Sequence, residues 1–467
     1  MTTFVEHQWS LALPVMHDYI AIPARSPMFD PEWERTGHLR RAAVLLRDWV
    51  DAQRVEGLAI ELVEVAGLTP VLFIEVAATS ASLAEHTVLV YGHLDKQPEM
   101  EPWSEGLGPW KPVLRGDRLY GRGGADDGYA VFSAVIALAA AHAAGTPHAR
   151  VCILIEASEE SSSVHLAQHL ERLFPRIGVA DLVIGLDSFC ESYDRLWTTT
   201  STRGVCGGVV HIDICADDPH SGRASGVLPS AFRVLRTLLD RLEDSDSGRV
   251  LLRSANVDIP RHRLDEAMVA AGAFPALSTS FRPVPSVRSM GETPYDELVN
   301  ETWRPALEVI GADGLPPVAD AGNVFRARMS VKLSLRVPPT ADVWAVADEL
   351  RSVVESDPPH GASVRLDAGA RGPGWASPPF ESWLFDAVDG ASRRHWGAPS
   401  ASCGVGGTIP FMGMLGDQMP DAQFLLIGVL GPGSNAHGPD EFLHLPTVHR
   451  VTETVVDVLA AHAEQCS

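Results

Sequence analysis

The sequence is poor in cysteine and in basic residues, and each shortage excludes a class of protein. Six cysteines occur among 467 residues and none forms a Cys-x-x-Cys pair, so neither a zinc ribbon nor a thioredoxin-type motif is present. Lys and Arg number 37 against 60 Asp and Glu, which gives a net charge of −23. Because nucleic-acid binding and attachment to anionic lipid both need a basic face, we expect neither.

Long apolar runs and targeting segments are also missing. No stretch of about 18 consecutive apolar residues appears, and the best candidate, Ala130–Ala144, is interrupted by Ser133 and His142. The N-terminus has no basic segment followed by an apolar core, so we expect no signal peptide. Scattered cysteines fit a reducing compartment. The sequence therefore predicts a cytoplasmic protein that does not contact membranes.

Three strongly apolar segments alternate with helical patterns in the first half of the chain. The segments are Thr87–Tyr91, Arg150–Ile155 and Leu182–Leu186, and helices are predicted between them over 126–145 and 164–174. Alternation of buried strand and helix is typical of a mostly parallel sheet with helices on both faces. The predicted fold class is therefore α/β.

The middle of the chain has a different pattern of half-buried strands and amphipathic helices. This α+β pattern occupies residues 206–372, although its part 244–322 is rich in Pro, Gly and Ser and hard to assign. After residue 372 the alternation of buried strands and helices resumes. The sequence thus predicts an α/β catalytic domain over 1–205 and 373–467, interrupted by an inserted α+β domain over 206–372.

Potential metal ligands follow the predicted strands, where sites form in open α/β sheets. They are His93 with Asp95, Asp126 with Asp127, Glu159 with Glu160, Asp187, and His437. Each has an ordinary explanation when taken alone, such as a loop histidine, a helix N-cap or an acidic turn. Together, two imidazoles and three carboxylates suit two zinc or manganese ions that share one carboxylate.

The motifs GHLD, GRGGADD, EASEES and NAHGPDE, in this order, resemble a family of dinuclear zinc peptidases. This family includes cytosolic non-specific dipeptidase, carnosinase, carboxypeptidase G, aminoacylase and acetylornithine deacetylase. The resemblance covers nearly the whole chain and is strongest to the dipeptidase–carnosinase branch. It implies a lid domain inserted into the catalytic domain, a homodimer formed through the lids, and two divalent ions per subunit (zinc, or else manganese or cobalt).

The resemblance also implies a role for each ligand. Asp126 would bridge the two metals, with His93 and Asp187 completing one site and Glu160 and His437 the other. Asp95 would orient His93. Glu159 would be the general base, taking a proton from the water held by the metals and giving it to the leaving amine. The peptide bond between Asp126 and Asp127 is expected to be cis.

Further expectations concern the inserted domain and a glycine-rich loop. The turn DDPHSG resembles a family turn whose histidine, here His220, stabilises the oxyanion in the partner subunit's active site. Arg336, in KLSLRVPP, would bind a substrate carboxylate. The remaining candidates are Asn323, which would assist His220, and Gly406, Gly407 and Thr408 of GVGGTIP, which would contact the substrate. A turn histidine and a structural arginine are the ordinary alternatives.

Two departures from the family pattern occur in these motifs, and the one before the glycine-rich loop bears on substrate choice. The family's Asp-Asp-Lys has Gly128 in place of lysine, and its Arg-Glu before the glycine-rich loop is Gly404-Val405. Neither departure removes a metal ligand. We therefore predict a metal-dependent hydrolase of a dipeptide, small peptide or N-acyl amino acid. The alternatives are an amidohydrolase or amide-forming enzyme acting on a specialised metabolite, and a catalytically silent binding protein.

Overall fold

The computed structural model describes residues 1–273, 275–281 and 283–467. Within these residues the chain divides into two compact units. The first comprises Met1–Thr200, Ser377–Ser402 and Pro410–Ser467, and the second comprises Ser201–Ala376 and Cys403–Ile409. The sequence pattern predicts Cys403–Ile409 in the catalytic domain, whereas this segment groups with the second unit.

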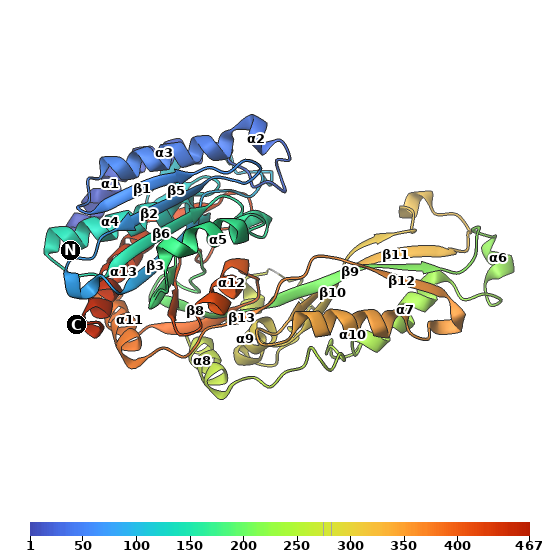
Figure 1. The fold of residues 1–467 in the computed structure, drawn as a ribbon. Coiled ribbons are helices and arrows are strands. Elements are labelled where there is room, and N and C mark those ends of the chain that lie inside the picture. The colour runs from blue at the N-terminus through green and yellow to red at the C-terminus, as the bar shows by residue number, and fades with distance from the viewer. Residues whose placement is uncertain (274, 282) are drawn as a thin grey trace. The chain divides into compact units, whose positions relative to one another are not determined.

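A large mixed sheet forms the centre of the first unit (Figure 1). Its strands run in the order β1-β2-β6-β3-β7-β15-β8. Neighbours among β6, β3, β7 and β15 pair in parallel, whereas β1 with β2, β2 with β6, and β15 with β8 pair antiparallel. The mostly parallel centre that the sequence predicts is confirmed. The strands are β1 (Leu58–Val63), β2 (Val71–Val76), β3 (Thr87–His93), β6 (Arg150–Glu156), β7 (Leu182–Gly185), β8 (Trp197–Thr202) and β15 (Gln423–Leu426).

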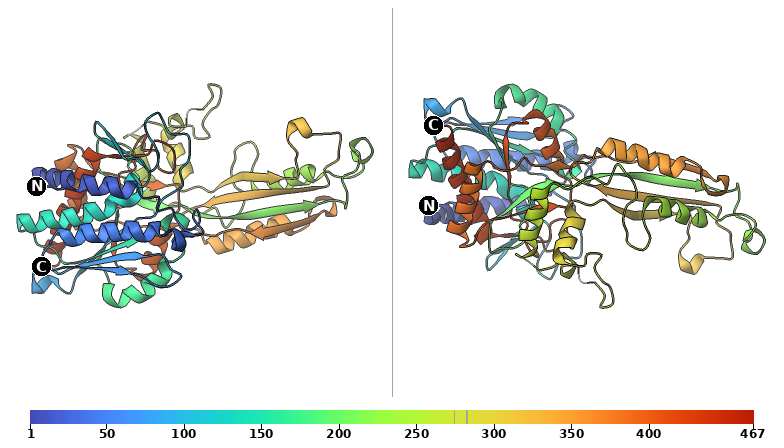
Figure 2. Two further views of the ribbon diagram at one scale, coloured as in Figure 1. Left: turned by 90° about the horizontal axis from the view of Figure 1, so that it is seen from above. Right: turned by 90° about the horizontal axis from the view of Figure 1, so that it is seen from below.

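Helices cover both faces of this sheet, which explains why its central strands read as continuous apolar runs. Alternate residues of β3 and β6, such as Val90 and Ile153, belong to a core shared with α1, α3, α4, α11 and α13. Figure 2 shows α1, α3 and α4 side by side. On the other face, Arg176 of α5 lies over the Phe73 ring. The helices are α1 (Thr2–Ile20), α3 (His38–Ala52), α4 (Tyr129–Ala144), α5 (Leu166–Ile177), α11 (Ser382–His395) and α13 (Leu445–Gln465).

The helical stretch that ends with α4 begins two residues before the predicted helix. An irregular turn over Gly124–Gly128 precedes α4, so Gly124–Ala144 is long and apolar enough to cross a membrane by length and hydropathy alone. However, 78% of its most apolar window is buried inside the protein. The stretch packs against α1, α13 and the strands β3 and β6, as a core helix does.

Shorter elements complete the first unit. A small antiparallel sheet has the order β16-β5-β4 and joins the chain near residue 120 to the segment after the His437 loop. The remaining elements are α2 (Trp33–Thr36), β4 (Val113–Arg115), β5 (Arg118–Tyr120), α12 (Pro410–Gln418) and β16 (Phe442–His444), while β14 (Ala401–Val405) pairs with β8.

The second unit is built on a four-stranded antiparallel sheet in the order β10-β11-β9-β12. Burial alternates along β11, so one face of the sheet forms the core under α7 and α10 (Figure 1). The segment that the sequence leaves unassigned contains α8, α9 and β10. The elements are β9 (Gly204–Asp213), α6 (Ser221–Ala224), α7 (Ala231–Leu242), α8 (Arg261–Ala271), α9 (Pro294–Thr302), β10 (Ala306–Asp313), β11 (Arg328–Val337), α10 (Val343–Glu355), β12 (Ser363–Ala368) and β13 (Trp375–Ala376).

Candidate metal centre

The sheet of the first unit brings the predicted ligands to one edge. His93 is the last residue of β3, the Glu159–Glu160 pair follows β6, and Asp187 follows β7. These three strands are parallel neighbours, so their carboxyl ends meet. His437 arrives on the loop after β15.

Asp126 lies between the two predicted histidine ligands. Its Oδ1 is 3.2 Å from Nε2 of His93, and its Oδ2 is 3.0 Å from Nε2 of His437. The irregular turn before α4 carries this residue, and the peptide bond between Asp126 and Asp127 is cis, as expected. Each oxygen of one carboxylate thus faces a different imidazole, as a bridging ligand requires.

The other predicted ligands lie around this contact. Asp187 Oδ2 is 3.7 Å from Nε2 of His93, and Glu160 Oε2 is 3.2 Å from Nε2 of His437. In each of two groups of three residues, all donor atoms lie within 4.8 Å of one another. The groups are His93, Glu159 and Asp187, and His93, Asp126 and Glu160. The structure therefore brings all five predicted ligands and the predicted general base together.

Asp95 has a wider set of contacts than the sequence suggests. The Nδ1 atom of His93 is 3.1 Å from the Asp95 carbonyl oxygen and 3.5 Å from its carboxylate. That carboxylate accepts hydrogen bonds from the backbone N–H of Glu159, at 3.1 Å, and of Glu160, at 3.0 Å. Asp95 therefore positions both the histidine and the glutamate pair.

Burial and mutual repulsion shift the acid–base equilibria of the cluster. Burial raises the pKa of the Asp187 carboxyl to about 7. Burial and the neighbouring Asp187 raise the pKa of Glu159 well above its ordinary value. Burial lowers the pKa of His437, but Asp126 and Glu160 more than offset this, so that it reaches about 11. Such a crowd of buried carboxylates is stabilised by divalent cations.

The donor set fits the two divalent ions that the sequence predicts. Glu160 Oε1 is buried and accepts no hydrogen bond from the residues that the structure describes, whereas Oε2 accepts one from Gln97 at 2.6 Å. A buried carboxylate oxygen without a donor is costly unless a cation satisfies it. Imidazole nitrogen and carboxylate oxygen are the donors that zinc binds in catalytic sites.

A buried ion pair that sequence reasoning missed supports the Asp126 turn. Arg122 Nη1 donates to Glu441 Oε2 at 2.5 Å, and the N–H of Gly123 donates to Glu441 Oε1 at 2.9 Å. Burial raises the pKa of Glu441 to about 7 despite this arginine. Arg122 belongs to the motif GRGGADD and Glu441 to NAHGPDE. Their position in these motifs is the one sequence feature that could have indicated a role for them.

In the second unit, two predicted substrate-binding residues meet. Nη1 of Arg336 donates to Thr408 Oγ1 at 3.4 Å, and Thr408 Oγ1 donates to the carbonyl oxygen of Arg203 at 2.6 Å. Nε of Arg203 donates to the carbonyl oxygen of Gly406 at 3.3 Å. Gly407 lies between these loop residues and is exposed. Sequence reasoning missed Arg203, whose guanidinium is nearly buried beside the loop.

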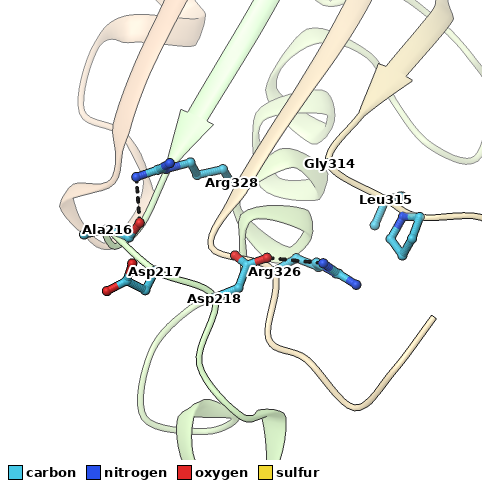
Figure 3. Close-up of a pocket in the computed structure, with 8 residues that line it drawn as sticks. Ala216, Asp217, Asp218, Gly314, Leu315, Arg326 and Arg328 are labelled. Carbon is cyan, nitrogen blue, oxygen red and sulfur yellow. Dashed lines mark hydrogen bonds and ion pairs between the residues drawn. The ribbon is translucent and has the colours of Figure 1, made fainter. Parts of the chain in front are cut away.

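His220 and Asn323 lie on neighbouring segments of the same unit. His220 caps α6, and the N–H of Ser221 donates to the Asn323 carbonyl oxygen at 3.0 Å. Asp218, just before the histidine, pairs with Arg326 at 3.2 Å at the edge of a surface pocket (Figure 3). The turn that carries His220 is therefore tied to the segment that carries Asn323.

Comparison with known families assigns the chain. The family model described as peptidase family M20/M25/M40 matches residues 89–461. The chain belongs to this family. The family predicted from the four motifs is thereby confirmed, and the protein is a peptidase.

Curated M20-type relatives include dipeptidases. The chain is 27% identical over 389 residues to the cysteinylglycine-S-conjugate dipeptidase of Corynebacterium striatum, with 81% of each chain covered. It is 25% identical over 406 residues to the Cys-Gly metallodipeptidase DUG1 of Saccharomyces cerevisiae, covering 82% of this chain and 80% of that one. The structure of human carnosine dipeptidase 1 superposes with a TM-score of 0.76 at 22% identity, covering 99% of this chain and 98% of that one.

Proposed function

We propose that this protein is a metal-dependent dipeptidase that hydrolyses the amide bond of dipeptides. Other small peptides and N-acyl amino acids are related substrates. The observation that carries the proposal is the position of Asp126, with its two oxygens 3.2 Å and 3.0 Å from the imidazoles of His93 and His437. The names of the bacterial and yeast relatives, both Cys-Gly-type dipeptidases, support this substrate class.

Two divalent ions would be shared among five ligands. Asp126 contributes to both ions, while His93 and Asp187 complete one site and Glu160 and His437 the other. Zinc is the metal that this mixed nitrogen and oxygen donor set favours, and manganese or cobalt can occupy the same set. When bound, such ions lower the pKa of a water molecule and polarise the scissile carbonyl group.

Glu159 acts as the general base. The Asp95 carboxylate accepts its backbone N–H, which fixes the start of the short 3₁₀ turn that carries it. Burial raises the pKa of Glu159, so its carboxyl group is suited to hold a proton between two steps. Glu159 takes a proton from the attacking water and delivers it to the leaving amine.

The second unit would bind the substrate and form a homodimer. Arg336 holds the substrate carboxylate, and Gly406, Gly407 and Thr408 contact the substrate next to it. His220, assisted by Asn323, stabilises the oxyanion in the active site of the partner subunit. The hydrogen bond between Arg336 and Thr408 supports a shared role for these two residues. We place the enzyme in the cytoplasm.

One local feature favours a second candidate, an amidohydrolase or amide-forming enzyme that acts on a specialised metabolite. A Cβ atom at Gly404 would lie 2.5 Å from the Oγ of Ser201 and 2.9 Å from the Cβ of Thr302, so a larger residue cannot replace this glycine without movement. Gly404 and Val405 thus stand where the resembling family has a charged pair. A site without that charge fits a less anionic substrate.

A substrate screen with two variants tests the proposal. Dipeptides, including Cys-Gly, and N-acyl amino acids are offered to the zinc-, manganese- and cobalt-loaded enzyme. Glu159→Gln should retain the metals and lose about 10²–10⁴-fold in kcat, because only proton transfer is removed. Glu160→Gln, the matched control, should lose metal as well. Turnover of non-peptide amides alone would favour the second candidate, and an active Glu159→Gln would refute the general base.

A further inference from the structure

A second cluster of metal-binding side chains lies at the amino ends of the same strands. His86 immediately precedes β3, and Asp181 immediately precedes β7. His462 and Cys466 belong to the C-terminal end of α13, one helical turn apart. The predicted catalytic ligands stand at the opposite, carboxyl ends of these strands, so the two clusters are separate.

The four side chains form a chain of three contacts. His86 Nδ1 is 3.3 Å from Asp181 Oδ1, and Asp181 Oδ2 is 3.8 Å from His462 Nε2. The same His462 nitrogen is 3.6 Å from Cys466 Sγ. The two imidazole rings are nearly perpendicular, with centroids 6.4 Å apart. His462 Nε2 therefore faces both a carboxylate and a thiol.

Each of these three separations is close to the spacing of neighbouring ligand atoms in a tetrahedral zinc site, and Asp181 faces the two histidines through different oxygens. With metal–ligand bonds of 2.0–2.3 Å, neighbouring ligand atoms of a tetrahedron stand about 3.3–3.8 Å apart. We propose that His86, Asp181, His462 and Cys466 bind one zinc-type divalent ion outside the catalytic centre. The side chains of His86 and Asp181 are 35% and 42% exposed, so both can turn to close the site around the ion.

The protonation states of the ligands are consistent with metal binding. Burial lowers the pKa of His462, which keeps its imidazole neutral near pH 7. Burial and Asp181 raise the pKa of the Cys466 thiol, so the ion must displace a proton there. Affinity should therefore increase as the pH rises.

The ion would fasten the end of the chain to the sheet. Asp181 already accepts the backbone N–H of Thr87, the first residue of β3, at 2.9 Å. A metal held by Asp181 and by the last turn of α13 would tie that turn to the start of two central strands. A metal ion that binds only the native state stabilises that state, so zinc should raise the unfolding temperature of the protein.

Cobalt substitution distinguishes this site from the catalytic centre. Cys466 is its thiolate donor, whereas the predicted catalytic ligands are histidines and carboxylates. Full-length protein loaded with Co²⁺ should show thiolate-to-cobalt charge-transfer absorption in the near ultraviolet. Cys466→Ser should abolish this band and bind one zinc fewer per chain, while peptidase activity persists. Cys215→Ser, which changes a half-buried cysteine of the second unit, should retain both the band and the zinc.

His86→Ala serves as the second variant, since its partly exposed side chain tolerates removal. It should weaken zinc binding at least tenfold and reduce the rise in unfolding temperature that zinc produces. Absence of the charge-transfer band in the wild type, or an equal zinc content in wild type and Cys466→Ser, would overturn the proposal. Neither result depends on the substrate or on the catalytic metals.

Discussion

The Asp95 carboxylate accepts the backbone N–H of Glu159 at 3.1 Å, and thereby joins the loop after β3 to the loop after β6. The same carboxylate accepts the N–H of Glu160. Asp95 is fully buried, so these hydrogen bonds are not exchanged with solvent. One side chain thus sets the positions of the proposed general base and of a proposed metal ligand.

Asp95→Asn should therefore impair both functions. The amide keeps the shape but loses the charge and one acceptor oxygen, so it cannot accept both N–H groups equally well. We expect metal affinity to fall about 10–100-fold, as for other residues that orient ligands. Competition with a chromogenic chelator measures this loss. Asp51→Asn, at an exposed position, is the control, and an equal affinity in both variants would contradict the assignment.

Arg336→Ala should raise KM for substrates with a free carboxylate. A hydrogen bond to a charged group contributes about 1.5–3 kcal/mol, so the loss should be roughly 10–100-fold in kcat/KM. Dipeptides are compared with their C-terminal amides. The wild type should prefer the acid, and Arg336→Ala should not. An unchanged preference would mean that Arg336 is only structural.

The central strands could be predicted from the sequence because burial on both faces leaves them uniformly apolar. The predictions for β3, β6 and β7 reach to within two residues of the observed ends. The first helix, α1, was not predicted. Its buried residues Val5, Trp9, Ala12, Met16 and Tyr19 are spaced as in an amphipathic helix, but Pro14 and the exposed Leu11 obscure this pattern in the sequence. The short helices α8 and α9 have few buried residues and gave equally weak periodicity.

The ligand positions could be predicted because each ligand follows a recognisable strand or stands in a motif. Supporting residues could not, because they act through neighbours that are distant in sequence. An example is position 128, where the family pattern has a lysine and this chain has glycine. A Cβ atom at Gly128 would collide with the Tyr19 ring, so no larger residue fits here. Lys96 instead places its ammonium group 4.0 Å from that ring centroid and donates to the Tyr19 carbonyl oxygen.

Stability should decrease between about pH 6.5 and pH 9 because of His395. Its Nε2 donates to Asp457 at 2.8 Å, and its Nδ1 is 3.2 Å from Glu453. Burial lowers the pKa of His395, but the two carboxylates raise it by a larger amount, so that it reaches about 9. A folded-state pKa above the unfolded value stabilises the protein below pH 6.5, and this contribution is lost as the pH rises through 9.

His395→Gln should remove this pH-dependent contribution. The expected loss is about 1–2 kcal/mol near pH 6, after allowance for solvent screening. Urea unfolding at pH 6 and pH 9.5 measures it. His7→Gln, an exposed histidine, should behave like the wild type. A variant whose stability still falls by the same amount across this range would refute the role of His395.

Mixed dimers test whether His220 acts on the partner subunit. His220→Ala and Glu159→Ala homodimers should each be nearly inactive. After subunit exchange, half of the dimers should be mixed, and each mixed dimer should contain one intact site. Activity should thus recover to about a quarter of the wild-type value, which follows from random pairing of identical folds. Recovery no greater than that of the parents would show that His220 does not act across the dimer.

The most direct test of the account is a zinc titration of metal-free enzyme during dipeptide hydrolysis. The Cys466→Ser protein is used, so that the proposed peripheral site does not bind zinc. Activity should rise until two zinc ions are bound per chain, because Asp126 contacts both histidine ligands. In Asp126→Asn this activity should be absent. Full activity with no zinc or a single zinc ion, or with Asp126→Asn, would contradict the shared carboxylate.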